Sequence, residues 1–159
     1  MKIYDCFSYW DEDLLLELRL NILNDYVDYF VIVEGNKTWQ NNYKKLRFDI
    51  SKFSKFKHKI IYIPVEDMPD GDNPYLRENF QRNCISRGLE NSNEEDLIII
   101  SDLDEIPNPE VLTKFKKIGL INDITFSENR ALNLAKRGFS KRKILIDLKQ
   151  KGIADKIAE

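Results

Sequence analysis

The sequence is poor in the residues that build disulfide frameworks, zinc sites and histidine-dependent catalytic centres. Its 159 residues include two cysteines, Cys6 and Cys84, and one histidine, His58. Two cysteines so far apart in sequence match neither a disulfide framework nor a zinc motif, so we expect both to be buried thiols in a reducing compartment. A catalytic triad or a multi-histidine metal site would depend on His58 alone, which we interpret as structural.

Long apolar runs are also missing. No stretch approaches the roughly 18 consecutive apolar residues of a membrane helix. Asp5 and Asp11 interrupt the N-terminal region, where a signal peptide would need an apolar segment. We therefore expect no membrane span and a cytoplasmic location. The content of 42% hydrophobic and 11% aromatic residues is typical of a folded globular chain with one core.

Charge is distributed unevenly along the chain. Residues 1–113 contain 13 Lys/Arg and 22 Asp/Glu, a net charge of −9, whereas residues 114–159 contain 12 and 5, a net charge of +7. This change predicts two segments with different partners. After Gly119 the pattern indicates helices only: one from Asn122 or Asp123 to Lys136, a second from Ser140 to Gln150, and a short third.

Apolar, β-prone runs alternate with helical patterns over residues 1–118. The runs at 2–7, 29–34, 59–65 and 97–100 predict strands, and those at 11–24, 51–57, 73–89 and 109–117 predict helices. This alternation indicates an α/β fold with a mostly parallel sheet flanked by helices. Residues 36–47 are expected to form a long loop near the site. In the first helix, the apolar face is predicted to consist of Leu14, Leu15, Leu18, Ile22 and Leu23.

An acidic pair follows the fourth predicted strand. The run Leu97–Ile100 is apolar throughout, which favours a strand buried on both faces. Asp102 and Asp104 stand two residues apart after it, so an extended backbone projects both carboxylates to one side. The carboxyl ends of parallel strands are where ligands bind, and paired carboxylates there favour Mg²⁺ or Mn²⁺. A solvated acidic turn is the alternative interpretation.

Five separated segments over residues 1–118 share the pattern of one protein family. They are Ile3-Tyr4-Asp5-Cys6-Phe7, Glu17-Leu18-Arg19-Leu20, Phe30-Val31-Ile32-Val33-Glu34, Gln81-Arg82-Asn83 and Ile100-Ser101-Asp102-Leu103-Asp104-Glu105-Ile106-Pro107. These segments resemble glycosyltransferase family 17, the family of the β-1,4-N-acetylglucosaminyltransferases, and the resemblance covers about residues 1–118. It implies a GT-A-like domain in which Asp102 and Asp104 form a DxD motif that holds Mn²⁺ or Mg²⁺ against a nucleotide-sugar donor, with transfer of N-acetylglucosamine to a glycan acceptor.

In that setting three further residues are expected to bind the donor. Glu34 ends the second predicted strand and is placed to face the nucleotide or its sugar; its alternative role is to cap loop amides. Arg77 and Arg82 lie on the helix predicted from 73 to 89 and can form bidentate pairs with the diphosphate. The alternative for Arg77 is a solvated position paired with Glu78.

Enzymes of this type also need a second half that binds the acceptor and supplies a carboxylate base. Only 57 residues follow Asp102, and they do not resemble that half. We therefore expect a truncated domain, 1–118, whose turnover is an open question and in which no catalytic residue is assigned.

Residues 119–159 contain four segments with a different pattern. They are Phe126-Ser127-Glu128-Asn129-Arg130, Lys136-Arg137-Gly138-Phe139-Ser140, Arg142-Lys143-Ile144 and Leu148-Lys149-Gln150-Lys151-Gly152-Ile153. These segments resemble one helical repeat of the RecX family of RecA regulators. The resemblance implies RecA or nucleic acid as a partner of the basic tail, and it defines an alternative function. A further alternative is a haloacid dehalogenase-type phosphatase, because a strand ending in Asp-x-Asp also resembles the first motif of that family, with Asp102 as nucleophile and Asp104 as acid/base.

Overall fold

The structure, a computed structural model, describes residues 1–118 and 123–150, with side chains described over 1–115 and 130–148. The chain divides into two compact units, Met1–Leu112 and Thr113–Glu159, and each is described by itself. The sequence placed the domain boundary after residue 118, at the end of the helix α3 (Pro109–Ile118), whereas the two units divide within that helix, after Leu112.

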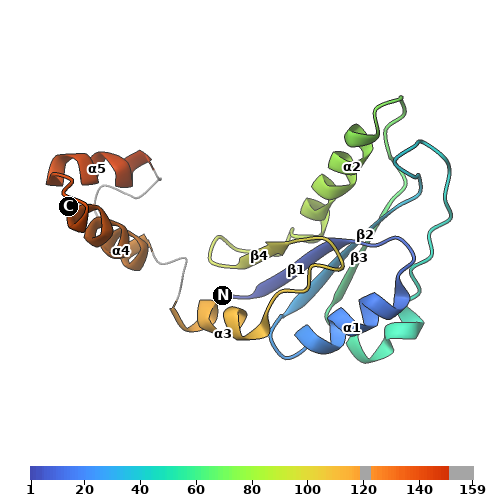
Figure 1. Cartoon of the computed structure of the whole chain (residues 1–159). Helices are drawn as coiled ribbons and strands as arrows, with labels where there is room; N and C mark the ends of the chain where they lie inside the picture. The colour runs from blue at the N-terminus through green and yellow to red at the C-terminus, as the bar shows by residue number, and fades with distance from the viewer. Residues whose placement is uncertain (119–122, 151–159) are drawn as a thin grey trace. The chain divides into compact units, whose positions relative to one another are not determined.

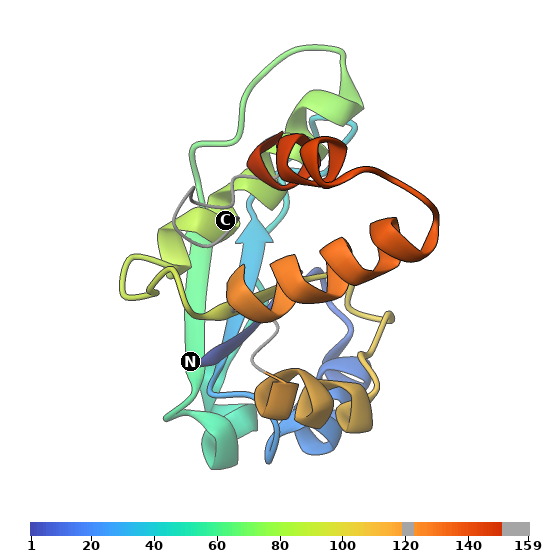
Figure 2. The ribbon, with the colours of Figure 1, turned by 90° about the vertical axis from the view of Figure 1, so that its left-hand side faces the viewer.

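The first unit is built on a four-stranded parallel sheet (Figure 1). Its strands are β1 (Ile3–Ser8), β2 (Tyr29–Gly35), β3 (Ile60–Val65) and β4 (Leu97–Ile100), in the order β3-β2-β1-β4. Figure 2 shows β2 and β3 running side by side. In their parallel register Phe30 pairs with Ile60. All three pairings are parallel, which confirms the predicted α/β class and parallel sheet.

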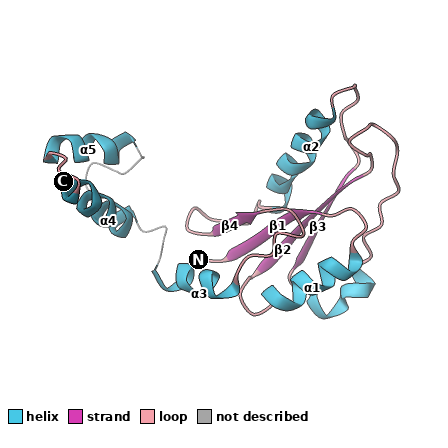
Figure 3. Ribbon diagram, viewed as in Figure 1, coloured by secondary structure: helices cyan, strands magenta, loops and turns pink. Residues whose placement is uncertain are grey.

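Helices flank the sheet, as Figure 3 shows. One side carries α1 (Asp13–Leu23) and the 3₁₀ helix η1 (Ile50–Phe56), and the other carries α2 (Pro74–Asn83), which continues into a second 3₁₀ helix, η2 (Cys84–Gly88). One apolar cluster lies between the sheet and the α2 and η2 segment. It is formed by Tyr4, Cys6, Val31, Val33, Val65, Met68, Cys84 and Ile85. Because strand side chains alternate between faces, Asp5 and Phe7 of β1 belong to the opposite face.

The position of β4 differs from the prediction of a strand buried on both faces. Leu97, Ile98 and Ile99 are only half-buried, and Ile100 is 55% exposed. The reason is its place in the sheet, because β4 pairs with β1 alone and is an edge strand. The fully buried strands are the central ones, β1 and β2.

Two helix predictions also need correction. The buried face of α1 is formed by Leu16, Arg19, Leu20 and Leu23, whereas Leu14 and Leu18, which were predicted to be in the core, are 84% and 51% exposed. The predicted helix at 73–89 is α-helical only to Asn83. The α1 error arises because a helix rich in apolar residues has more than one apolar stripe, and the sheet contacts only one of them. The second difference is local, because the chain continues after Asn83 as the 3₁₀ helix η2.

In the second unit, α4 (Asp123–Lys136) and α5 (Lys141–Gln150) are joined by a turn at Gly138, where φ is +82°. These limits match the predicted helix ends, and Ile144 and Leu145 pack against the buried Leu148. Arg130 of α4 forms an ion pair with Asp147 of α5, Nη2 to Oδ1 2.8 Å. The predicted cap at Asn122 and the third helix lie outside the described residues. Over the described part of the chain, no helix is long and apolar enough to cross a membrane.

Candidate functional site

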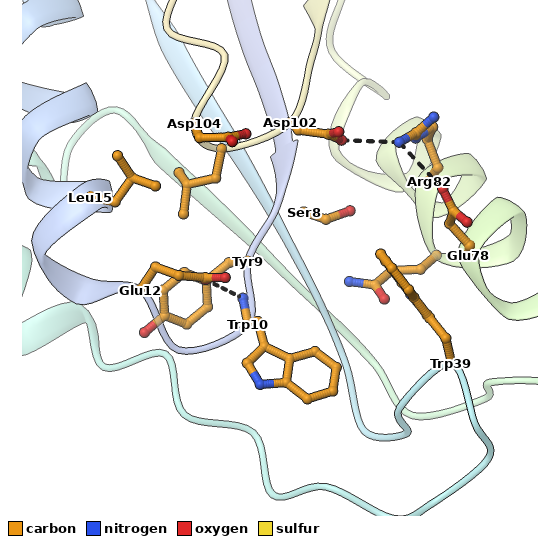
Figure 4. Close-up of a pocket in the computed structure, with 12 residues that line it drawn as sticks. Ser8, Tyr9, Trp10, Glu12, Leu15, Trp39, Glu78, Arg82, Asp102 and Asp104 are labelled. Atoms are coloured by element: carbon orange, nitrogen blue, oxygen red, sulfur yellow. Dashed lines mark hydrogen bonds and ion pairs between the residues drawn. The ribbon is translucent and has the colours of Figure 1, made fainter. Parts of the chain in front are cut away.

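A pocket of about 440 Å³ opens at the carboxyl edge of the sheet (Figure 4). In a parallel α/β sheet this edge is the usual place for ligands, because the loops that follow the strands converge there. The pocket is lined from the loop after β1, from α1, from the 36–47 loop, from α2 and from the loop after β4. The lining residues are Ser8, Tyr9, Trp10, Glu12, Leu15, Trp39, Glu78, Gln81, Arg82, Asp102, Leu103 and Asp104.

The loop after β4 places both acids of the predicted pair in this pocket. Asp102 and Asp104 are exposed, while Leu103 between them is buried. The backbone turns here, because the amide of Glu105 donates to the carbonyl of Asp102 at 3.0 Å. Alternation of Asp, Leu and Asp through this turn therefore anchors the loop by one apolar side chain and leaves two carboxylates facing the pocket.

Arg19 of α1 anchors this loop through hydrogen bonds. It was not among the predicted site residues. Its guanidinium is fully buried and forms a two-point ion pair with the buried Asp5 of β1, Nη2 to Oδ1 2.7 Å and Nε to Oδ2 2.8 Å. The same guanidinium donates to the carbonyls of Asp102 at 2.6 Å and Leu103 at 3.0 Å, and to Ser101 Oγ at 2.7 Å. A buried cation of the first helix thus determines the course of the acidic loop.

Arg82 of α2 is the predicted cation that the structure brings to the acid pair. Its Nη2 lies 3.0 Å from Asp102 Oδ1 and 3.7 Å from Glu78 Oε1 (Figure 4). The Arg82 side chain is 47% exposed and lines the pocket. It is therefore held loosely enough to turn from Asp102 towards an anionic ligand.

Glu34 and Arg77, which were expected to bind the donor, do not line this pocket. The carboxylate of Glu34 is fully buried and accepts hydrogen bonds from the amides of Arg47 at 2.8 Å and Phe48 at 3.0 Å, which is the loop-capping alternative. Arg77 is 1% exposed and donates to the carbonyl oxygens of Trp39 and Gly71. Neither group is free to meet a diphosphate in this arrangement.

Tyr9 contributes a neutral wall to the pocket. Its hydroxyl donates to Asp13 Oδ1 at 2.6 Å. Burial, followed by this hydrogen bond to an ionised carboxylate, raises the pKa of Tyr9 well above its ordinary value. The ion pair with Lys52, with help from Tyr9, in turn lowers the pKa of Asp13. Tyr9 therefore stays protonated at neutral pH and does not act as a base.

The oxygen donors in the pocket suit a metal that takes few protein ligands. Among the described residues, no group of three or more His, Cys, Asp and Glu side chains is arranged to hold a metal ion. Asp102 and Asp104 offer two carboxylates from one loop to the pocket, which the carboxylates of Glu12 and Glu78 also line. Mg²⁺ in nucleotide sites is bound in this way, by one or two carboxylates, with the remaining ligands coming from phosphate and water. The donor set therefore fits a metal that binds together with a phosphate ligand.

Comparison with known proteins identifies a family for this chain. The family model of glycosyltransferase family 17 matches residues 1–130, which extends beyond the expected limit at 118 and into α4. The human and rat β-1,4-mannosyl-glycoprotein 4-β-N-acetylglucosaminyltransferases are each 34% identical to this chain over 104 residues, and the mouse protein is 33% identical. Each match covers 58% of this chain and 19% of the relative.

The chain thus matches about a fifth of the length of these curated relatives. No solved structure matches it. Because the family model spans most of the chain and includes every residue that lines the pocket, the chain belongs to glycosyltransferase family 17.

Proposed function

We propose that this chain forms the donor-binding part of a GT-A-like glycosyltransferase that uses Mn²⁺ or Mg²⁺ to transfer N-acetylglucosamine from a nucleotide-diphosphate donor to a glycan acceptor. The observation that carries the proposal is the pair Asp102 and Asp104, which face one pocket at the carboxyl edge of a parallel sheet. Family membership supports the reaction class, and the names of the relatives support the sugar.

Each residue of the acid loop has a separate task in this proposal. Asp102 and Asp104 would hold the ion, which would offset the negative charge that develops on the departing oxygen. Arg82 leaves Asp102 and pairs with a phosphate oxygen, since guanidinium groups form strong charge-assisted bonds to phosphate. Arg19 keeps the loop in place throughout, because its hydrogen bonds are to main-chain carbonyls and not to the carboxylates.

The phosphatase alternative has less support. In a phosphatase of that type, Asp102 would be a nucleophile that follows a central strand of the sheet. The core of the domain would come after it in the chain. Here the strand before Asp102 is the edge strand β4, and the described chain after it is helical. The family match also points to sugar transfer.

Turnover tests the proposal. We expect release of UDP from UDP-N-acetylglucosamine in the presence of Mn²⁺ and a mannose-containing glycan, and loss of that release when the metal is chelated. A matched control uses the double variant D102N/D104N, which should release no UDP with or without metal. Metal-independent release that the double variant retains would contradict the proposal.

A second candidate function is favoured by the basic turn between α4 and α5. Arg137, Lys141, Arg142 and Lys143 are exposed there. Phe139 is 41% exposed, with the charged ends of Arg137 and Lys143 5.8 and 6.0 Å from its ring centre. Clustered cations beside an exposed ring suit nucleic acid, the partner that the RecX resemblance implies alongside RecA.

For this second candidate we expect salt-sensitive binding of single-stranded DNA. The triple variant K141E/R142E/K143E should abolish it, because binding of this kind depends on cations that neutralise phosphates. Fluorescence anisotropy of a labelled oligonucleotide at two salt concentrations measures the effect. The matched control is D102N/D104N, which should bind DNA like the wild type. Equal binding by the triple variant would exclude the basic turn as the site.

A further inference from the structure

The two tryptophans of the chain, Trp10 and Trp39, both line the candidate pocket. Their side chains come from different loops, Trp10 after β1 and Trp39 in the 36–47 loop. Figure 4 shows both indoles on the opposite side of the pocket from Asp102 and Asp104. They are 39% and 43% exposed, a large apolar area to leave in water. The pocket therefore has an acidic side and an aromatic side.

The backbone of Trp10 is held by charged groups. Its amide donates to Glu12 Oε2 at 3.0 Å, and its carbonyl accepts from Lys44 Nζ at 3.3 Å. The same ammonium lies 5.0 Å from the centre of the Trp10 ring and 2.5 Å from Oε1 of the buried Glu34. Glu34, which was expected to contact the donor, is thus connected through Lys44 to one of the aromatic walls.

The backbone of Trp39 is held in the same manner by Arg77. The Arg77 guanidinium donates through Nε at 2.8 Å, and also through Nη2, to the carbonyl of Trp39, and through Nη1 to the carbonyl of Gly71 at 2.5 Å. Arg77 is the second residue that was expected to bind the donor. A buried charge costs free energy unless it is fully bonded, so two buried charges, each tied to a loop with an exposed indole, indicate preformed walls.

We propose that Trp10 and Trp39 bind the nucleobase of the donor by stacking against its ring, while Asp102 and Asp104 face the diphosphate. This inference rests on the proposed function, because one pocket takes both parts of the nucleotide. Every nucleobase has a flat π-face, and an indole ring stacks on such a face whichever base it is. Glu34 and Arg77 are positioning residues in this arrangement.

The polar groups beside the indoles favour a base over a sugar ring. The carboxylate of Glu12 accepts from the amides of Trp10 and Asp11, and Gln81 Nε2 donates to the carbonyl of Val33 at 3.2 Å. Glu78 is paired with Arg82. These polar groups therefore already have partners within the protein. A sugar would need them to bind its hydroxyls, whereas a planar base needs mainly an exposed indole face.

Intrinsic fluorescence tests the inference directly, because the whole tryptophan emission of the chain comes from the two pocket walls. With Mg²⁺ present, we expect UDP to change the emission and pyrophosphate to leave it unchanged. The single variants W10F and W39F assign the change to each ring. By calorimetry, W10A and W39A should each weaken UDP binding roughly 5- to 150-fold and leave pyrophosphate binding unaltered.

The matched control is Y43A, which removes an aromatic ring of the 36–47 loop that is 79% exposed and does not line the pocket. It should bind UDP like the wild type. If UDP bound without changing the emission of the wild type, and if W10A and W39A bound UDP with unchanged affinity, this inference would be overturned while the proposed function would stand. N-acetylglucosamine 1-phosphate changing the emission where UDP does not would also overturn it, in favour of the sugar. Failure of both UDP and pyrophosphate to bind would overturn the proposed function, and the inference with it.

Discussion

Replacement of Arg19 by methionine is expected to lower the free energy of unfolding by about 3–5 kcal/mol. Methionine fills a similar apolar volume but leaves the carboxylate of Asp5 buried without a counterion. It also removes the donors to the carbonyls of Asp102 and Leu103. Urea denaturation followed by circular dichroism measures the loss. The free energy of unfolding of the R19K variant should lie between those of the wild type and R19M, because lysine keeps the charge but lacks the planar set of guanidinium donors.

Two variants separate this effect from a general sensitivity of arginine positions. R82M removes a half-exposed arginine that also pairs with Asp102, and it should change stability by less than about 1 kcal/mol. The double variant D5L/R19M should recover part of the loss, since no charge is left unpaired. An R19M protein as stable as the wild type would show that the buried pair does not hold the loop.

Replacement of Asp102 or Asp104 by asparagine is expected to reduce metal-dependent UDP binding by at least about 100-fold, equivalent to roughly 2.7 kcal/mol. Asparagine keeps the shape of the side chain and removes the charge that a divalent ion needs. Both residues are exposed, so neither substitution should destabilise the fold. Calorimetric titration of UDP with Mn²⁺ present and absent measures the loss for each variant.

Glu105 provides the matched control for the acid pair. It is an exposed carboxylate of the same loop that does not line the pocket. E105Q removes the same charge from the same surface and should bind UDP and Mn²⁺ like the wild type. Equal weakening by E105Q and D102N would mean that the overall negative charge of the loop, and not a defined pair of ligands, attracts the ion.

The features that local pattern controls were predictable from the sequence. Alternation of apolar strands with helical periods determines the α/β class, and the Asp-Leu-Asp step after an apolar run places two carboxylates at the end of a strand. The side chain of Asn108 is a local contact of the same kind, because it accepts from the amide of Glu110 at 2.9 Å at the start of α3. These are contacts between near neighbours in the chain.

The contacts that assemble the pocket were not predictable, because they join residues far apart in sequence. In the sequence, Arg19 is one charged residue of a leucine-rich helix. Its contacts with Asp5 and with the loop after β4 arise only when the helix packs against the sheet. Glu34 was expected to contact ligand because it ends a strand, and Arg77 because arginine pairs with phosphate. The partners that they have in the structure lie in the 36–47 loop and its neighbours, a segment with no periodic pattern. The sequence does show that both tryptophans, Trp10 and Trp39, follow predicted strands, in segments that reach the carboxyl edge of the sheet.

The most direct measurement is the anomalous scattering of manganese in crystals grown with UDP and Mn²⁺. We expect one manganese peak at coordination distance, about 2.1 Å, from a carboxylate oxygen of Asp102 or Asp104 and from the diphosphate. The guanidinium of Arg82 should have moved from Asp102 to a phosphate oxygen. Manganese bound elsewhere, or a diphosphate seated in the pocket with both aspartates turned to solvent and no metal between them, would contradict the assignment of this pair as the metal ligands.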